Sequence, residues 1–221
     1  MLQISNYDIY IFDCDGVILD SNVLKIDAMY KALVTCGFKR NEVDLCVDYF
    51  KNNFGLSRFH HVKYFLTNFI TVNKIDVEKV EVDILNHFSK QVKTLYLSAE
   101  ITPGFVSFIS SLNGDKYVAS GSEQQELRDV FKQRGLDIHF KQIFGSPTSK
   151  SELIRRVVSL DSSMRYVMFG DAVSDFNACC DNKIDFIYYA PYSNVKNKMK
   201  SLADENGFIM LDSWPVINNT L

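Results

Sequence analysis

Short apolar runs alternate with amphipathic stretches over most of this chain. The apolar runs lie at 7–13, 116–120, 141–145, 165–169 and 184–190, and most are rich in β-branched or aromatic residues. Continuous runs of this kind are typical of strands buried on both faces of a sheet. Between them, apolar residues recur at helical spacing in 104–113, 123–134 and 150–159. Repeated strand–helix units predict an α/β fold, a parallel sheet covered by helices.

Residues 21–97 interrupt this alternation. They show helical patterns only, at 22–36, at about 41–53, at 57–70 and at 75–95. An all-helical block between the first strand and the remaining strands indicates an inserted domain. We therefore expect an α/β core domain formed by residues 1–20 and 98–221, and a helical inserted domain of residues 21–97.

Composition and charge narrow the class of protein. Of the 221 residues, 47% are hydrophobic and 23% are charged, which is ordinary for a globular chain with a sizeable core. The net charge is −3 and no long Lys/Arg block occurs, so nothing indicates nucleic-acid binding. No apolar run approaches the ~20 residues of a membrane span, and no secretory signal is visible. Five cysteines without a metal-type pair favour reduced thiols, and we expect a cytoplasmic protein.

Polar residues gather where the predicted strands end. The stretches are Asp13-Cys14-Asp15-Gly16, Ser120-Gly121-Ser122, Lys150 in "GSPTSKSEL", and Asp171 and Asp175 in "GDAVSD". In a parallel α/β sheet, ligands bind at the carboxyl ends of the strands. We therefore expect these four stretches, distant in sequence, to converge on one edge of the sheet.

These residue types together suit phosphoryl transfer. Asp oxygens are the hard ligands that Mg²⁺ prefers, and the cation would let Asp13 and Asp171 both stay charged. A carboxylate beside a phosphate can attack phosphorus and form an aspartyl-phosphate. Asp15 would then protonate the leaving oxygen and later activate water. Lys150 and the hydroxyl of Ser120 would stabilise the charge of the transferring group.

At these residues the chain resembles the haloacid dehalogenase superfamily, most of whose members are Mg²⁺-dependent phosphatases. "DCDGVILDS" is similar to the first motif of the family, DxDGVxxDS, "VASGS" to the second and "FGDAVSD" to the fourth, GDxxxD. Lys150 fits the third motif, and the resemblance spans residues 8–190 in the expected order. The helical block lies where the phosphoglycolate phosphatase and β-phosphoglucomutase subgroup carries its cap. The "TPGF" at 102–105 resembles the subgroup's usual junction between cap and core. The resemblance implies a Rossmann-like core with an inserted helical cap.

The resemblance also implies catalytic and metal-binding residues. Asp13 would be the nucleophile and Asp15 the acid/base. Mg²⁺ would be bound by Asp13, by the backbone carbonyl of Asp15 and by Asp171. Asp175 would be a further ligand or the partner that orients Asp171.

The phosphate group would be bound by Ser120, by the N–H of Gly121 and by Lys150. Relatives often have a proline next to the motif-three lysine, whereas this chain has "SPTSK". Lys141 lies in the same region and is therefore an alternative to Lys150.

The segment 52–65 of the expected cap contains several polar residues among aromatic ones. In related caps a glycine-containing turn here reaches over the active site, which makes Arg58 a candidate contact of the leaving group. The alternative is an ordinary helix with polar residues outside and an apolar stripe of Phe59, Val62, Phe65 and Leu66. Adjacent helical residues point about 100° apart, which argues against His60 and His61 as a metal pair.

These observations predict a Mg²⁺-dependent phosphatase. It would hydrolyse a small phosphomonoester, a sugar phosphate or a similar metabolite, through phosphorylated Asp13. A phosphomutase of the β-phosphoglucomutase type and a non-catalytic phosphometabolite-binding protein are the alternatives. We expect a small phosphorylated metabolite as the partner, no nucleic acid or membrane, and a monomer or homodimer.

Overall fold

A computed structural model describes residues 4–72, 75–159 and 163–216. The two ends of the predicted core, 1–3 and 217–221, lie outside the described residues. The strands are β1 (Ile9–Phe12), β2 (Asp115–Glu123), β3 (Gln142–Ser146), β4 (Tyr166–Gly170), β5 (Asp185–Tyr189) and β6 (Ile209–Leu211). The α-helices are α1 (Asn22–Thr35), α2 (Arg40–Asn52), α3 (Arg58–Asn68), α4 (Val77–Ser98), α5 (Phe105–Ser111), α6 (Gln124–Gln133), α7 (Lys150–Val158), α8 (Val173–Asn182) and α9 (Lys196–Asn206).

The strands form one parallel sheet in the order β3-β2-β1-β4-β5-β6. The central strand β1 is buried over its whole length, as its continuous apolar sequence predicts. Its neighbours are β2 and β4, and Phe12 pairs with Val118 on one side and with Phe169 on the other. Strands far apart in the sequence therefore end next to one another at the carboxyl edge of the sheet.

Helices cover both faces of the sheet, and the side chains of β1 alternate between them. Phe12 faces the layer that contains α5, where it packs against Phe105, Phe108 and Trp214. Ile11 faces the other layer, which is formed mainly by α7, α8 and α9. The predicted α/β fold is confirmed. Neither α9 nor the short strand β6 is predicted from the sequence.

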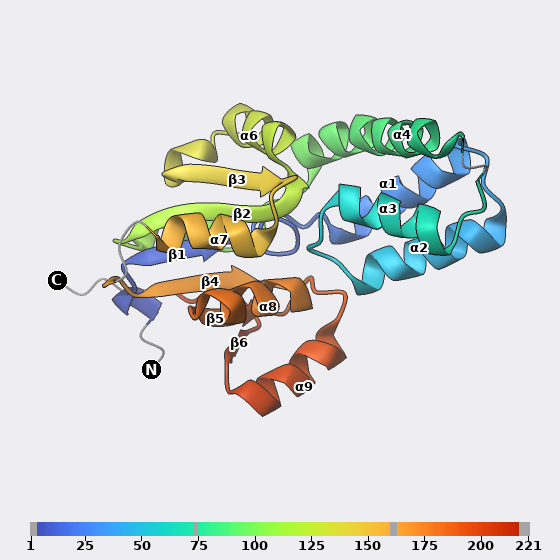
Figure 1. Cartoon of the computed structure of the whole chain (residues 1–221). Helices are drawn as coiled ribbons and strands as arrows, with labels where there is room; N and C mark the ends of the chain where they lie inside the picture. The colour runs from blue at the N-terminus through green and yellow to red at the C-terminus, as the bar shows by residue number, and fades with distance from the viewer. Residues whose placement is uncertain (1–3, 73–74, 160–162, 217–221) are drawn as a thin grey trace.

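The helices α1–α4 form a bundle at the carboxyl end of the strands (Figure 1). We call them the cap helices. In α4 the buried residues Ile84, Phe88, Val92 and Tyr96 recur every fourth position, so one face of the helix is turned inward. The predicted helical insertion after β1 is confirmed. Among the described residues, no helix is both long enough and apolar enough to cross a membrane.

Candidate active site

Asp13 directly follows the central strand, at the carboxyl edge of the sheet. Its backbone N–H donates to the carbonyl of Phe169 in β4 (2.9 Å), so the parallel pairing continues to the start of the loop. Its side chain is buried. Because β2 and β4 flank β1, the segments that end these strands lie on either side of Asp13.

Three carboxylates meet at this edge. Asp13, Asp171 and Asp175 each offer one oxygen, and these oxygens all lie within 4.8 Å of one another. The Oδ2 atom of Asp175 accepts hydrogen bonds from the backbone N–H groups of Asp171 and Ala172, at 3.0 Å each. Gly170 has no room for a Cβ, because Asp175 packs directly on its backbone. The turn between β4 and α8 therefore positions two of the three carboxylates.

The three buried carboxylates repel one another, and a bound cation would relieve this repulsion. Burial, with Asp175 and Asp15 nearby, raises the pKa of Asp13 to about 7, although Lys150 acts in the opposite direction. Burial, with Asp175 and Asp13 nearby, raises the pKa of Asp171 well above its usual range. The Oδ1 atom of Asp171 is buried and has no hydrogen-bond partner among the described residues. A hard divalent cation with oxygen ligands satisfies such groups, so this donor set fits Mg²⁺.

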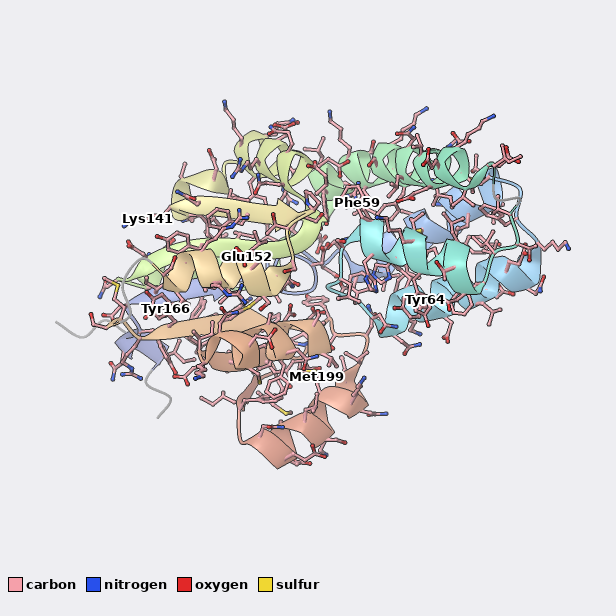
Figure 2. All side chains as sticks on the ribbon, in the orientation of Figure 1. Phe59, Tyr64, Lys141, Glu152, Tyr166 and Met199 are labelled. Carbon is pink, nitrogen blue, oxygen red and sulfur yellow. The ribbon has the colours of Figure 1, made fainter. Side chains whose placement is uncertain are left out.

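The structure brings Lys150, and not Lys141, to the carboxylates. The Nζ atom of Lys150 lies 3.0 Å from Oδ1 of Asp13 and also contacts Asp175. Burial alone lowers the pKa of Lys150, but the two carboxylates raise it above its usual range, so the ammonium stays charged. Lys141 lies at the opposite end of the sheet, where it pairs with Asp115 (Figure 2).

The carboxylate of Asp15 is enclosed by a hydrogen-bond network that the sequence analysis does not predict. Lys25 of α1 donates to Oδ2 at 2.8 Å, and the hydroxyl of Tyr96 in α4 lies 2.8 and 2.9 Å from the two oxygens. Ser21 donates to Oδ1 at 2.6 Å, and Ser122 donates to Oδ2 at 2.9 Å. Because α1 and α4 are cap helices and Ser122 belongs to β2, the network joins the cap helices to the sheet.

This network gives Asp15 a different proton affinity from Asp13. Burial raises the pKa of Asp15, but the charge of Lys25 and the hydrogen bonds of Lys25, Ser21 and Tyr96 outweigh burial and lower the pKa below its usual value. Asp15 is therefore ionised in this arrangement. Two carboxylic groups whose surroundings push their pKa values apart suit a division of catalytic roles.

Asn22 is a second residue that the sequence analysis misses. Its Nδ2 atom donates to Oδ2 of Asp171 (2.7 Å) and to the backbone carbonyl of Tyr192 (3.0 Å). Both Asn22 and Lys25 are buried on the same side of α1 as its apolar residues. Both are polar residues on the apolar stripe of a helix. Because a buried polar group requires a hydrogen-bond partner, this position in the sequence could have identified them as candidate site residues.

Ser120 and Gly121, the predicted phosphate ligands, lie near the end of β2. Ser120 is buried, and its Oγ accepts the backbone N–H of Ser122 (3.2 Å). Gly121 lies directly under the loop between α2 and α3. The backbones approach so closely that a Cβ at this position would collide with the carbonyls of Gly55 and Leu56. The loop thus covers the place where the sequence predicts phosphate binding.

The same loop is attached to the turn that carries the acidic cluster. Gly55 has a φ of +87°, a left-handed conformation that glycine adopts without strain, and a Cβ here would collide with Ser174. The hydroxyl of Ser174 donates to the carbonyl of Phe54 (3.0 Å). The cap helices are therefore closed over the sheet edge in this structure.

Arg58, the predicted contact of the leaving group, begins α3 and is buried. Its guanidinium donates to both carboxylate oxygens of Glu126 in α6, at 3.0 and 2.7 Å, and also to Ser89. This ion pair holds the guanidinium at the wall of a cavity under the cap helices. Its contact with a substrate stays a prediction.

Two cavities border the covered edge. A small one of about 10 Å³ lies between Asp15 and the cap helices. A larger cleft of about 340 Å³ lies between the loop before α3 and the first turns of α7 and α8, and it reaches Lys150. Gly55, Leu56 and Gly121 line both spaces, so the loop separates them.

Comparisons with known proteins agree with this geometry. The family model for haloacid dehalogenase-like hydrolases matches residues 7–179. No curated protein sequence matches the chain. Among solved structures, a predicted phosphoglycolate phosphatase from Haemophilus somnus 129pt has a TM-score of 0.73 at 11% identity and covers 96% of both chains. A predicted phosphatase from Clostridium acetobutylicum has a TM-score of 0.71 at 16% identity, covering 93% of this chain and 94% of its own.

A third solved structure contains a bound sugar. CbbY from Rhodobacter sphaeroides, in complex with xylulose-(1,5)bisphosphate, has a TM-score of 0.66 at 15% identity and covers 94% of this chain and 95% of its own. At these identities the three structures show a common fold.

Proposed function

Because the chain belongs to the haloacid dehalogenase-like hydrolases, we propose that it is a Mg²⁺-dependent phosphatase acting on a small phosphomonoester. The observation that carries this proposal is the meeting of Asp13, Asp171 and Asp175 with the charged Lys150 at one edge of the sheet. The similar folds of two predicted phosphatases support it.

The acidic cluster would hold the metal. Asp13, Asp171 and Asp175 would supply carboxylate oxygens, and Asp15 its backbone carbonyl. When bound, Mg²⁺ supplies the positive charge that lets these buried carboxylates and a phosphate share one site.

In the first step, an ionised oxygen of Asp13 attacks phosphorus and the bond from phosphorus to the leaving oxygen breaks. Asp15 donates a proton to that oxygen, so the alcohol leaves neutral. The approach of an anionic substrate raises the pKa of Asp15, so Asp15, which is ionised in the structure, takes up this proton from solution when the substrate binds. Lys150, Ser120 and the N–H of Gly121 would stabilise the phosphoryl oxygens.

In the second step, Asp15 takes a proton from water as the water attacks phosphorus. The bond from phosphorus to the Asp13 oxygen breaks and inorganic phosphate leaves. Asp13 is then ionised again, and Asp15 holds the proton taken from water, which it returns to solution once the site is empty. The hydrogen bonds that keep Asp15 ionised in the structure favour its action as a base here.

The cap would exclude water and select the substrate. We propose that residues 21–97 act as one cap domain over a core of 1–20 and 98–221, with Arg58 near the leaving group. A closed cap over a small cavity favours metabolites over protein substrates. The sugar bisphosphate bound to CbbY supports a phosphorylated sugar or a similar metabolite as substrate.

The test is phosphate release by the purified protein. We expect it to hydrolyse p-nitrophenyl phosphate with Mg²⁺, and to stop when EDTA removes the metal. Asp13→Asn should lower kcat by roughly 10³-fold or more because the amide cannot act as the nucleophile. Asp44→Asn, an exposed change in α2, is the matched control and should keep full activity. Substantial activity in Asp13→Asn would overturn the proposal.

The same preparation separates hydrolysis from the mutase alternative. Incubation with a hexose phosphate should release free phosphate in proportion to the substrate consumed. Accumulation of an isomeric hexose phosphate without free phosphate would instead identify a phosphomutase.

A further inference from the structure

The small cavity under the cap helices is where the leaving group of a substrate would lie. Its volume of about 10 Å³ is room for one water-sized group. Asp15, the acid/base candidate, and Gly121, a phosphate-binding candidate, both border it. A phosphomonoester whose phosphate lies at Gly121 and whose leaving oxygen faces Asp15 must place its next atoms in this cavity.

His61 of α3 lines this cavity and is buried, with 1% of its surface exposed. Neither ring nitrogen has a hydrogen-bond partner in the part of the chain that the structure describes. Burial, together with the charges of His60 and Lys25, lowers the pKa of His61 to about 3, so the ring is neutral. A neutral imidazole offers one donor and one acceptor, and leaving both buried and unused costs free energy.

The charged groups at the cavity wall are already paired. Lys25 donates to Asp15 and Ser122 at 2.8 and 3.1 Å. Arg58 is held by Glu126. The wall therefore carries little net charge to attract an anionic leaving group, and His61 is left to bind a neutral polar one.

The rest of the wall is aromatic. The phenyl rings of Phe50, Phe54 and Phe88 line the cavity, and the ring of Phe50 lies 4.6 Å from that of His61, centroid to centroid. Apolar rings around one polar group suit a carbon chain that carries a hydroxyl group. A hydroxyl can accept a bond from the N–H of the ring or donate one to the other nitrogen, so it can bind either nitrogen of His61, whereas a carboxylate can only accept.

We propose, on the basis of the proposed function, that His61 binds a hydroxyl group of the leaving alcohol and makes the enzyme prefer phosphate esters of short polyols. The cavity has room for one water-sized group, so it can take a single hydroxyl of a short chain but not a sugar ring. His61 is thus a specificity-determining residue that acts on the leaving group while the phosphoryl chemistry stays with the sheet edge.

The test compares two substrates with the same three-carbon chain. Glycerol phosphate esterified at a terminal carbon has hydroxyls next to the leaving oxygen, and n-propyl phosphate has none. We expect the protein to favour glycerol phosphate in kcat/KM by about tenfold or more. In His61→Leu this preference should fall to near unity, while kcat/KM for propyl phosphate stays within about threefold of the original protein.

Two further variants separate recognition from folding. His61→Gln keeps a donor and an acceptor and should retain part of the preference, even where the leucine variant unfolds. His87→Leu replaces an exposed histidine of α4 and should change neither substrate. NMR of isotope-labelled histidine in the Asp13→Asn protein gives a readout without turnover: the His61 ring signals should shift on adding glycerol phosphate but not propyl phosphate.

The other outcomes contradict either the role of His61 or the proposed function. Equal losses on both esters in His61→Leu and His61→Gln, or unchanged His61 signals, would mean that the ring has a packing role and would overturn the inference. Hydrolysis of p-nitrophenyl phosphate but of neither alkyl ester would overturn the inference and leave the proposed function standing. Hydrolysis of none of the three would overturn the proposed function, and the inference with it.

Discussion

Asn22 shows how one side chain ties the cap helices to the acidic cluster. It is the first residue of α1, it is buried, and its amide holds one oxygen of Asp171 at 2.7 Å. The second bond of the amide, to the carbonyl of Tyr192, fixes its own orientation. Asp171 therefore keeps Oδ1 free for a cation. Partners that orient metal ligands in this way usually matter for metal affinity.

We therefore expect Asn22→Ala to weaken Mg²⁺ binding by about tenfold, because Asp171 loses the hydrogen bond that orients it. Isothermal titration of the protein with Mg²⁺ measures this without a substrate. Asn68→Ala removes an exposed asparagine of α3 that donates to the carbonyl of Tyr64 in the same helix, and this variant should bind Mg²⁺ as the original protein does. Equal Mg²⁺ affinities in the two variants would show that Asn22 does not position Asp171.

At the scale of elements, α3 shows where hydrophobic periodicity fails. The apolar stripe predicts Phe59 inside, but Phe59 is half-buried, and the buried residues of the helix are Arg58, His61, Val62 and Phe65 (Figure 2). Two polar side chains replace apolar ones because this face of α3 is turned toward a cavity and toward α6. A pattern that ranks residues by hydropathy assigns such polar residues to solvent.

The ion pair between Arg58 and Glu126 joins α3 to α6 and should help to keep the cap helices closed. The side chains are 3% and 17% exposed, so removing one charge leaves the other poorly solvated. We expect Glu126→Gln to lower the free energy of unfolding by roughly 2–3 kcal/mol. Urea denaturation measures this loss, and faster hydrogen exchange in α3 would locate it.

Glu152→Gln is the control for this change. Glu152 pairs with Arg155 on the surface of α7 (Figure 2), where its side chain is 41% exposed. Ion pairs of this kind contribute little, so the variant should unfold as the original protein does. If Glu126→Gln behaves like this control, the pair between α3 and α6 is not what holds the elements together.

At the scale of the whole molecule, stability should depend on pH through His61. Burial and nearby positive charge lower the pKa of His61 from 6.5 to about 3 in the folded protein. Between these values the unfolded chain binds a proton that the folded protein does not. The free energy of unfolding should therefore fall as the pH drops below 6.5, and the loss should level off near pH 3.

Urea denaturation between these pH values tests this sign. His61→Leu removes the group, so its stability should fall less steeply with acid, by about 1.4 kcal/mol per pH unit. The carboxylates contribute equally to both proteins and cancel in the comparison. His87→Leu should keep the original slope. Parallel slopes for all three proteins would mean that His61 takes up its proton in the folded state.

Much of this architecture is determined by local patterns in the sequence. Buried strands and amphipathic helices each carry their own pattern, so the order of elements, the parallel sheet and the helical insertion follow from periodicity. The candidate nucleophile Asp13 and the acidic residues Asp171 and Asp175 also follow from the sequence. Asp13 and Asp171 each come directly after a strand, and Asp175 lies in the first turn of the helix after the second of these strands. The strand β6 could not be predicted, because its three residues are too few to show a hydrophobic pattern typical of a strand.

Only the tertiary structure decided which polar groups meet. Tyr96 bonds to Asp15 across 81 positions of sequence, and Asn22 bonds to Asp171 across 149. The choice of Lys150 over Lys141 likewise depends on which end of a strand faces the cluster. A hydrogen bond between distant residues requires the cap helices to dock on the sheet in one orientation. Hydrophobic patterning specifies which faces are buried, but not which buried groups are brought within hydrogen-bonding distance.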